Sequence, residues 1–336
     1  MSNHQRLSYL DSLKVLAAFC VVFIHSASIP WAESDIYSFF VLNLYEGLIR
    51  WCVPVFAMIS GAIFIRKDIT VHEIFSKYIF RIFTAFIFWS AFYALIHYHV
   101  NGDFDYAVSL FITGYFHMWY LPMTMALYAV VPFIKLIAQS KSLTKYFLVL
   151  SFISFLAFPQ AINTTLLFSG FYGSVLAQLS GRFYFSLAGG FSGYFLLGYV
   201  LSVIDIRPKL ERLIYSLGIA GFIMTVVFSL AASIIMDKPD QRFYDAMSIN
   251  IMLESAAVFV YFRQHNVSSA FISRISRYSL GAYLVHAEVI RQARLLNLFS
   301  FCPLISVPVV SAVILIISFA VSALLNHIPV VRKYIV

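Results

Sequence analysis

Long apolar runs dominate this chain, and short polar segments separate them. A helix needs about 20 apolar residues to cross the hydrocarbon core of a bilayer. The pattern therefore predicts an all-α polytopic membrane protein with about ten transmembrane helices, in a single integral-membrane domain that covers residues 1–336. The expected spans are roughly 9–29, 37–64, 82–98, 118–138, 146–162, 183–204, 213–236, 247–262, 277–296 and 304–326.

The amino-acid composition narrows the possible class of protein. Hydrophobic residues make up 61% of the chain and charged residues 11%, which excludes an ordinary soluble domain and a disordered chain. The first run resembles a signal peptide, but Asp11, Lys14 and His25 interrupt it and many spans follow, so we expect a retained helix. The three cysteines have no disulfide or zinc spacing, and we expect no metal site.

Charge placement predicts the orientation. Of the 23 Lys and Arg residues, 17 fall in the alternate segments that a cytoplasmic N-terminus would place inside. The loop from His97 to His117 contains Asp103 and Asp105 but no Lys or Arg, which is typical of an external loop. The positive-inside rule then places both termini in the cytoplasm, and it explains the net charge of +8 without a nucleic-acid partner.

The first helix carries a polar stripe. Lys14 and His25 are eleven residues apart, about 20° from three full turns, and Asp11 lies within about 60° of Lys14. A neutral imidazole can take a proton from a sugar hydroxyl. A cation at the cytoplasmic end of the helix suits a donor substrate that carries phosphate groups. The alternative is that Lys14 snorkels and pairs with Asp11, while His25 is a satisfied interior histidine.

Three further cations lie at helix breaks or entries. Arg50 precedes Pro54, so it can donate to the carbonyl that the proline frees or to an anion. Lys77 and Arg81 open the third span one turn apart. They are either a positive-inside anchor or a contact for phosphate groups.

Other polar and aromatic residues have two interpretations each. His117, Trp119 and Tyr120 form either an aromatic belt or a stacking floor for a sugar. Glu254 and His286 lie in the middle of late spans and should face the bundle interior. For both, structural pairing is at least as good an explanation as catalysis.

Two local patterns give packing predictions. Glu288 and Arg291 are three residues apart on one helix and should form an ion pair. The glycines at 189, 190, 193 and 198 favour close helix packing over a hinge.

Several of these segments resemble the membrane acyltransferase-3 family. The family signature in the first helix is an arginine, ten residues and a histidine; here Lys14 and His25 keep that spacing, with lysine in the arginine position. Lysine keeps the charge but lacks the planar fork. Further segments that resemble family blocks are Arg50 to Pro54, Ser60-Gly61, Lys77 with Arg81, His117 to Leu121 with Tyr128 and Pro132, Tyr194 to Tyr199, and Ser279 to His286. The chain is most similar to the short inner-membrane branch whose members O-acetylate surface glycans, enterobacterial common antigen among them.

The resemblance implies a ten-helix enzyme of the bacterial inner membrane. It would move an acyl group, most simply acetyl, from cytoplasmic acetyl-CoA to a hydroxyl of a surface polysaccharide or lipid-linked glycan. Membrane lipids would surround the enzyme, and it would need no metal or prosthetic group. The implied roles are catalysis by His25 with Lys14, donor binding by Lys77, Arg81 and Arg50, acceptor binding by His117, Trp119 and Tyr120, and polar support by Asp11, Glu254 and His286.

Two other classes of function compete with this one. A transporter or flippase of a lipid-linked sugar would also need basic and aromatic residues at both mouths. The chain has no evident internal repeat, which many transporters have, and its polar stripe lies on one helix. A sensor without chemistry would tolerate the loss of Lys14 and His25.

Overall fold

A computed structural model describes residues 7–33, 36–182 and 190–336, and within these ranges every regular element is helical. The first half contains α1 (Ser8–Ala27), η1 (Pro30–Glu33), α2 (Ile36–Ile49), α3 (Cys52–Phe64), α4 (Val71–Glu73), η2 (Ile74–Ile79), α5 (Phe80–Asn101), α6 (Phe104–Thr113), α7 (Tyr120–Ala129), α8 (Val131–Ala138), α9 (Lys141–Phe152) and η3 (Ile153–Ala157). The second half contains α10 (Phe158–Phe168), α11 (Gly170–Arg182), α12 (Phe191–Val203), α13 (Pro208–Met236), η5 (Arg242–Tyr244), α14 (Ile249–Gln264), α15 (Ala270–Ile275), η6 (Ser276–Tyr278), α16 (Ser279–Leu295), α17 (Pro303–Leu325) and α18 (Pro329–Tyr334).

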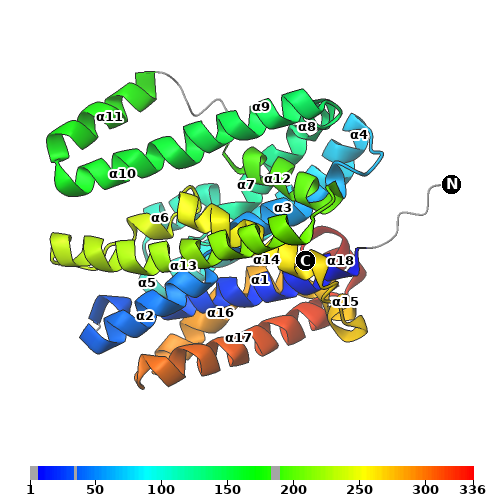
Figure 1. The fold of residues 1–336 in the computed structure, drawn as a ribbon. Helices are drawn as coiled ribbons and strands as arrows, with labels where there is room; N and C mark the ends of the chain where they lie inside the picture. Colours follow the sequence, from blue (N-terminus) through cyan, green and yellow to red (C-terminus); the bar gives the residue numbers. More distant parts are fainter. Residues whose placement is uncertain (1–6, 34–35, 183–189) are drawn as a thin grey trace.

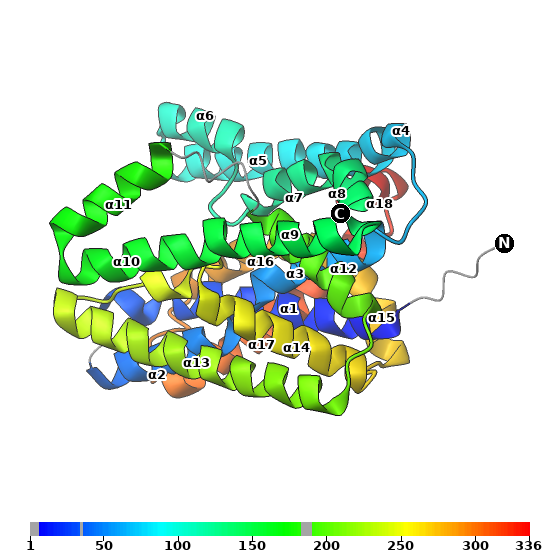
Figure 2. The ribbon, with the colours of Figure 1, turned by 45° about the horizontal axis from the view of Figure 1, so that its top comes forward.

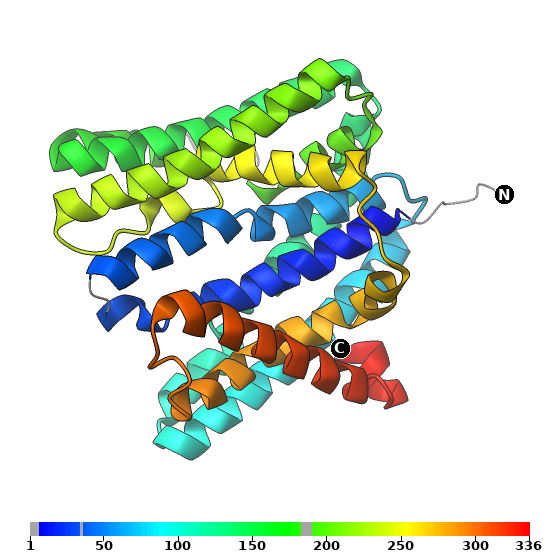
Figure 3. The same cartoon turned by 60° about the horizontal axis from the view of Figure 1, so that its bottom comes forward.

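The helices form one elongated bundle. Helices α9 and α10 lie across one face, α13 and α14 pack together beside them, and α5 and α6 form another pair (Figures 1 and 2). Helix α1 crosses the middle of the bundle and packs against α3, α16 and α17 (Figure 3). The polar side chains of α1 can therefore meet residues from distant parts of the chain.

One end of the bundle gathers basic residues, and we call it the basic end. Helices α4, α15 and α18 lie there together with the start of α1 (Figure 1). Backbone carbonyls hold several of the cations: Lys135 donates to Lys67 at 2.5 Å, and Arg263 donates to Leu201 at 2.6 Å and to Ile204 at 2.8 Å. The basic end is defined by Arg66, Lys67, Lys77, Arg81, Lys135 and Arg263.

Two long apolar segments are broken inside the bundle. The regular helix is interrupted at Arg50 and Trp51, between α2 and α3, where Pro54 has no N–H for the Arg50 carbonyl, although the two helices together form one span, Tyr37–Phe64. Helices α7 and α8 meet at an angle of 56° just before Pro132. Between α6 and α7 the chain turns at Gly114, whose φ is +82°.

The predicted spans largely agree with the helices. In the described part of the chain, seven helical segments are long and apolar enough to cross a membrane, or eight if the bent α7–α8 pair is one span. Helix α16 has only 17 residues and carries several charges, and α12 has 13 described residues after a predicted start that lies outside the described ranges. The all-helical membrane class is thus confirmed, while the count of ten and the cytoplasmic termini stay predictions.

Glycines allow α3 and α12 to touch. A Cβ atom on Gly61 would lie 1.7 Å from the Phe195 carbonyl oxygen, and one on Gly198 would lie 2.2 Å from that of Met58. Both partners are backbone atoms, so relief requires the helices to separate. The sequence prediction of close packing is confirmed at Gly198.

We expect Gly198→Ala to destabilise the protein by about 1–3 kcal/mol or more, because the new methyl group overpacks the α3–α12 contact. Thermal unfolding in detergent measures the effect. Gly170→Ala is the matched control, since no atom lies within 4 Å of a Cβ there. Equal melting temperatures for the two variants would contradict the interpretation.

Candidate active site

Three histidines from distant parts of the chain, one of them on α1, lie next to one another inside the bundle. His25 lies near the end of α1, His286 lies on α16, and His117 lies in the turn between α6 and α7. The ring centroids of His25 and His286 are 5.4 Å apart with the rings stacked at 25°, and those of His117 and His286 are 4.9 Å apart at 80°. We call these three residues the histidine cluster.

Two members of the cluster are fully enclosed. The exposed fraction is 1% for His117 and 0% for His286, whereas His25 is half-buried. Neither ring nitrogen of His117 has a hydrogen bond of ordinary geometry, and His286 Nε2 has none either. A buried polar atom without a partner costs about 1–3 kcal/mol. Such a cluster is a candidate site for a polar ligand.

Tyr283 fixes the cluster from two sides. Its backbone carbonyl contacts His286 Nδ1, and its hydroxyl donates to the His117 carbonyl. The Leu284 carbonyl, which also interacts with the His117 ring, accepts the Tyr93 hydroxyl at 2.6 Å. These bonds hold the turn before α7 against α16.

Phe116 supplies the aromatic surface next to His25. The two ring centroids are 5.0 Å apart in an edge arrangement, and Phe116 is 55% exposed. Trp119 points away from the cluster: it is 47% exposed and contacts Phe191 at 5.9 Å. Tyr120 contacts Tyr283 at 6.0 Å. Of the three predicted acceptor residues, only His117 joins the cluster itself.

A second polar group lies at the break between α2 and α3. Arg50 Nε donates to Glu46 at 2.5 Å, and its guanidinium carbon lies 4.9 Å from the centre of the Tyr244 ring. Glu46 is 2% exposed. The Arg50 charge also acts on the His25 imidazole. Sequence reasoning missed Glu46, although its spacing of four residues before Arg50 is a recognisable helical pair.

This pair decides between the two interpretations of Arg50. The sequence left two partners open, the carbonyl freed by Pro54 or an anion. The structure pairs its Nε with an anion, the Glu46 carboxylate, and leaves the terminal amino groups without a hydrogen bond among the described residues. Arg50 is therefore available to a ligand near His25.

The polar stripe of α1 faces the segment that carries His286. The Ser276 hydroxyl donates to Asp11 at 2.8 Å, and His25 stacks on His286. Both partners belong to the 276–286 segment, as expected for residues on one face of α1. Lys14 is half-buried on the same helix, between these two contacts along the chain.

The two cations of the third span remain at the basic end. Lys77 is exposed on η2. Arg81 donates to the Val336 carbonyl at 2.6 Å, and Trp89 donates to Ile335 at 3.1 Å. Arg81 thus holds the last residues of the chain against α5. Of the three residues predicted to bind the acyl donor, Lys77 and Arg81 lie at the basic end, whereas Arg50 lies between α2 and α3.

A row of four tyrosine rings and the Ser60 side chain extends from the basic end to the histidine cluster. Lys67 donates to the Tyr78 hydroxyl, and the Tyr78 and Tyr128 ring centroids are 6.4 Å apart. The Ser60 side chain lies close to both Tyr128 and Tyr120. Tyr120 then contacts Tyr283 beside the histidines. We call this set the tyrosine row; its members are Tyr78, Tyr128, Ser60, Tyr120 and Tyr283.

Glu254 faces the interior, as predicted, and its carboxyl group contacts the Thr225 hydroxyl. Thr225 Oγ1 lies 2.6 Å from Glu254 Oε1 and 2.9 Å from the Gly221 carbonyl, and Asn250 donates to the same hydroxyl at 2.7 Å. One hydroxyl hydrogen cannot serve two acceptors well, so a neutral carboxyl that donates to Thr225 satisfies all three contacts. Glu288 and Arg291 form the predicted ion pair at 2.7 Å.

We expect Glu254→Gln to keep both stability and activity, because an amide can donate to Thr225 in place of the carboxyl group. Glu254→Ala should lose about 1–3 kcal/mol by leaving that network incomplete. Melting temperature and activity of the two variants check this. An inactive but stable Glu254→Gln protein would instead assign Glu254 to the chemistry.

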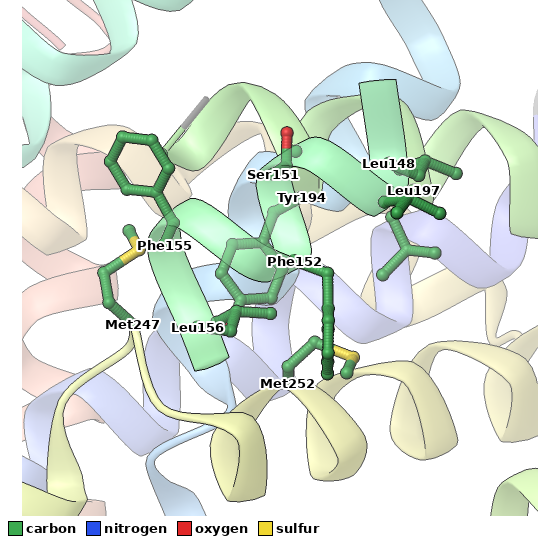
Figure 4. A pocket seen from close by; sticks show the side chains of 12 residues that line it. Leu148, Ser151, Phe152, Phe155, Leu156, Tyr194, Leu197, Met247 and Met252 are labelled. Carbon is green, nitrogen blue, oxygen red and sulfur yellow. The ribbon is translucent and has the colours of Figure 1, made fainter. Parts of the chain in front are cut away.

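The apolar cavity in Figure 4 lies away from the histidines. It has a volume of about 270 Å³, and side chains from α9, η3, α12, α14 and the segment before α14 line it, among them Phe155, Tyr194 and Met252. Its wall is almost entirely hydrocarbon. In the described ranges, no three His, Cys, Asp or Glu residues are grouped so that they could hold a metal ion.

The histidine cluster, Arg50 and the tyrosine row together form a candidate site for polar chemistry inside the helical bundle. The chain matches the family described as an acyltransferase domain, acyltransferase family 3, over residues 7–327, and it belongs to that family. No curated protein and no solved structure matches the chain.

Proposed function

We propose that this acyltransferase moves an acetyl group from cytoplasmic acetyl-CoA to a hydroxyl of a surface polysaccharide or lipid-linked glycan, in the bacterial inner membrane with both termini cytoplasmic. The observation that carries the proposal is the tyrosine row, which connects the basic end to the histidine cluster. This row would give the donor a polar route across the bundle, between cations that suit its phosphates and an imidazole that suits proton transfer.

The donor would enter at the basic end. Coenzyme A is polyanionic, and Lys67, Lys77 and Lys135 concentrate positive charge there. Its pantetheine arm would follow the tyrosine row, whose hydroxyls can bind amide groups. Lys14 would face the same route from α1. The thioester carbonyl would then lie near Arg50, whose terminal amino groups can stabilise the developing oxyanion.

His25 would act as the general base. Its imidazole takes the proton of the acceptor hydroxyl while the hydroxyl oxygen attacks the thioester carbonyl. The carbon–sulfur bond then breaks, and the thiolate of coenzyme A receives the proton from His25, so no net proton is consumed. A transient acyl-imidazole on His25 is the alternative route through the same residue.

Two measurements test the proposal together. Purified protein in nanodiscs should release coenzyme A from acetyl-CoA in the presence of glycan extracted from its own cells. Mass spectrometry of surface glycan from cells with and without the gene should then show an acetyl increment only where the protein is present. A transporter or flippase of a lipid-linked sugar would give neither thioester turnover nor a mass increment.

A further inference from the structure

The position of His286 fixes which of its nitrogens carries hydrogen. Its Nδ1 contacts the Tyr283 carbonyl oxygen, which can only accept a hydrogen bond. Nδ1 must therefore be the N–H, and the Nε2 atom of the neutral ring is left with a lone pair and no hydrogen. The carbonyl belongs to the same helix turn, so this tautomer is part of the fold.

The lone pair of His286 Nε2 has no donor. The side chain is 0% exposed, and no polar atom of the described residues hydrogen-bonds to Nε2. Buried polar atoms in native proteins are nearly always paired. An acceptor left open beside His25 indicates that a ligand brings the missing hydrogen.

The imidazoles of His25 and His286 lie side by side, and each ring, when neutral, has one acceptor nitrogen. The rings are stacked at 25° with centroids 5.4 Å apart, a separation that two hydroxyl groups on adjacent carbons can bridge when each donates to one ring. A ligand with a single hydroxyl would satisfy only one of them. His117 closes the other side of His286.

We propose that the histidine cluster recognises a vicinal diol of the acceptor sugar, in which His25 deprotonates the reacting hydroxyl and His286 Nε2 accepts a hydrogen bond from its neighbour. This inference rests on the proposed function and adds the class of acceptor. The neighbouring hydroxyl keeps its hydrogen throughout. Only the reacting oxygen forms a bond to the acyl carbon, and its proton passes through His25 to the departing thiolate.

Two small ring alcohols test the class of acceptor. Purified protein receives acetyl-CoA with either trans-1,2-cyclohexanediol or cyclohexanol, and mass spectrometry quantifies the acetyl ester. We expect the diol to be acylated at least tenfold faster, because the site leaves a buried acceptor unpaired when the second hydroxyl is missing. Equal rates, or no ester from either alcohol by protein that acetylates its own glycan, would overturn the diol proposal.

Two variants of His286 separate recognition from folding. Glutamine can place its amide oxygen near the Nε2 position, whereas asparagine can replace only the Nδ1 donor to Tyr283. We expect His286→Gln to retain the preference for the diol, and His286→Asn to fold but to acylate both alcohols at one low rate. If His286→Asn still discriminates between the alcohols, the residue is only structural.

Nuclear magnetic resonance of histidine-labelled protein gives a readout that does not depend on turnover. The side-chain carbon and nitrogen shifts of His286, assigned through the variants, should report the Nδ1–H tautomer. An Nε2–H tautomer would refute the proposal even in an active enzyme. Wild-type protein that acetylates nothing while His286 has the expected tautomer would instead count against the proposed function.

Discussion

His25→Ala should abolish acetylation of the surface glycan while leaving the protein in the membrane at its normal level. Removing a positioned general base costs about 10²–10⁴-fold in rate, and loss of an acyl-carrying nucleophile would cost no less. His25 is half-buried and its ring has no structural hydrogen bond among the described residues, so its truncation should spare the fold. Mass spectrometry of glycan from cells with matched protein levels measures the effect.

His99→Ala is the control for that experiment. His99 is exposed on the last turn of α5 and takes no part in the histidine cluster. Glycan from this variant should carry the full acetyl increment. Normal acetylation by His25→Ala would remove both catalytic roles proposed for His25, whereas equal loss in the two variants would point to a general effect on the protein.

Glu46→Ala should prevent stable folding. The substitution removes the only carboxylate that contacts Arg50 in the described structure, and it leaves a largely buried cation at the break between α2 and α3. Breaking a buried ion pair from one side costs about 3–5 kcal/mol, a large part of the stability of an ordinary domain. The amount of protein in the membrane and its melting temperature should both fall sharply.

The double variant Glu46→Gln, Arg50→Gln tests this cause. It removes both charges and should recover most of the folded protein, but not its activity if Arg50 binds the acyl carbonyl. Asp205→Ala is the control, because Asp205 and Arg207 are both exposed and 3.9 Å apart. An exposed ion pair contributes little to stability. A single Glu46→Ala variant as stable as Asp205→Ala would show that Arg50 finds another partner.

The sequence predicts what depends on one helix at a time. Apolar runs locate most of the helices, and the spacing of Asp11 and His25 places them on one face, which the contacts to Ser276 and His286 bear out. The interior position of Glu254 follows from the cost of a lipid-facing carboxyl. Each of these inferences needs only helical geometry and the properties of the bilayer.

What the sequence cannot supply is the meeting of distant segments. His117 meets His286 and Tyr283 from α16, whereas Trp119, two residues later, is 47% exposed. The role of Arg81 depends on where the last residues of the chain pack. Both outcomes are set by tertiary contacts, which local patterns in one sequence do not encode.

The contact between α3 and α12 has a consequence for genetics. At Gly61 and Gly198 every substitution introduces an atom where a backbone carbonyl already lies, so selection would keep glycine there even in a relative that had lost its catalysis. A screen for inactive mutants will return these positions beside those of the chemistry. Immunoblots of membrane fractions will sort the two groups, since only the glycine mutants should be depleted.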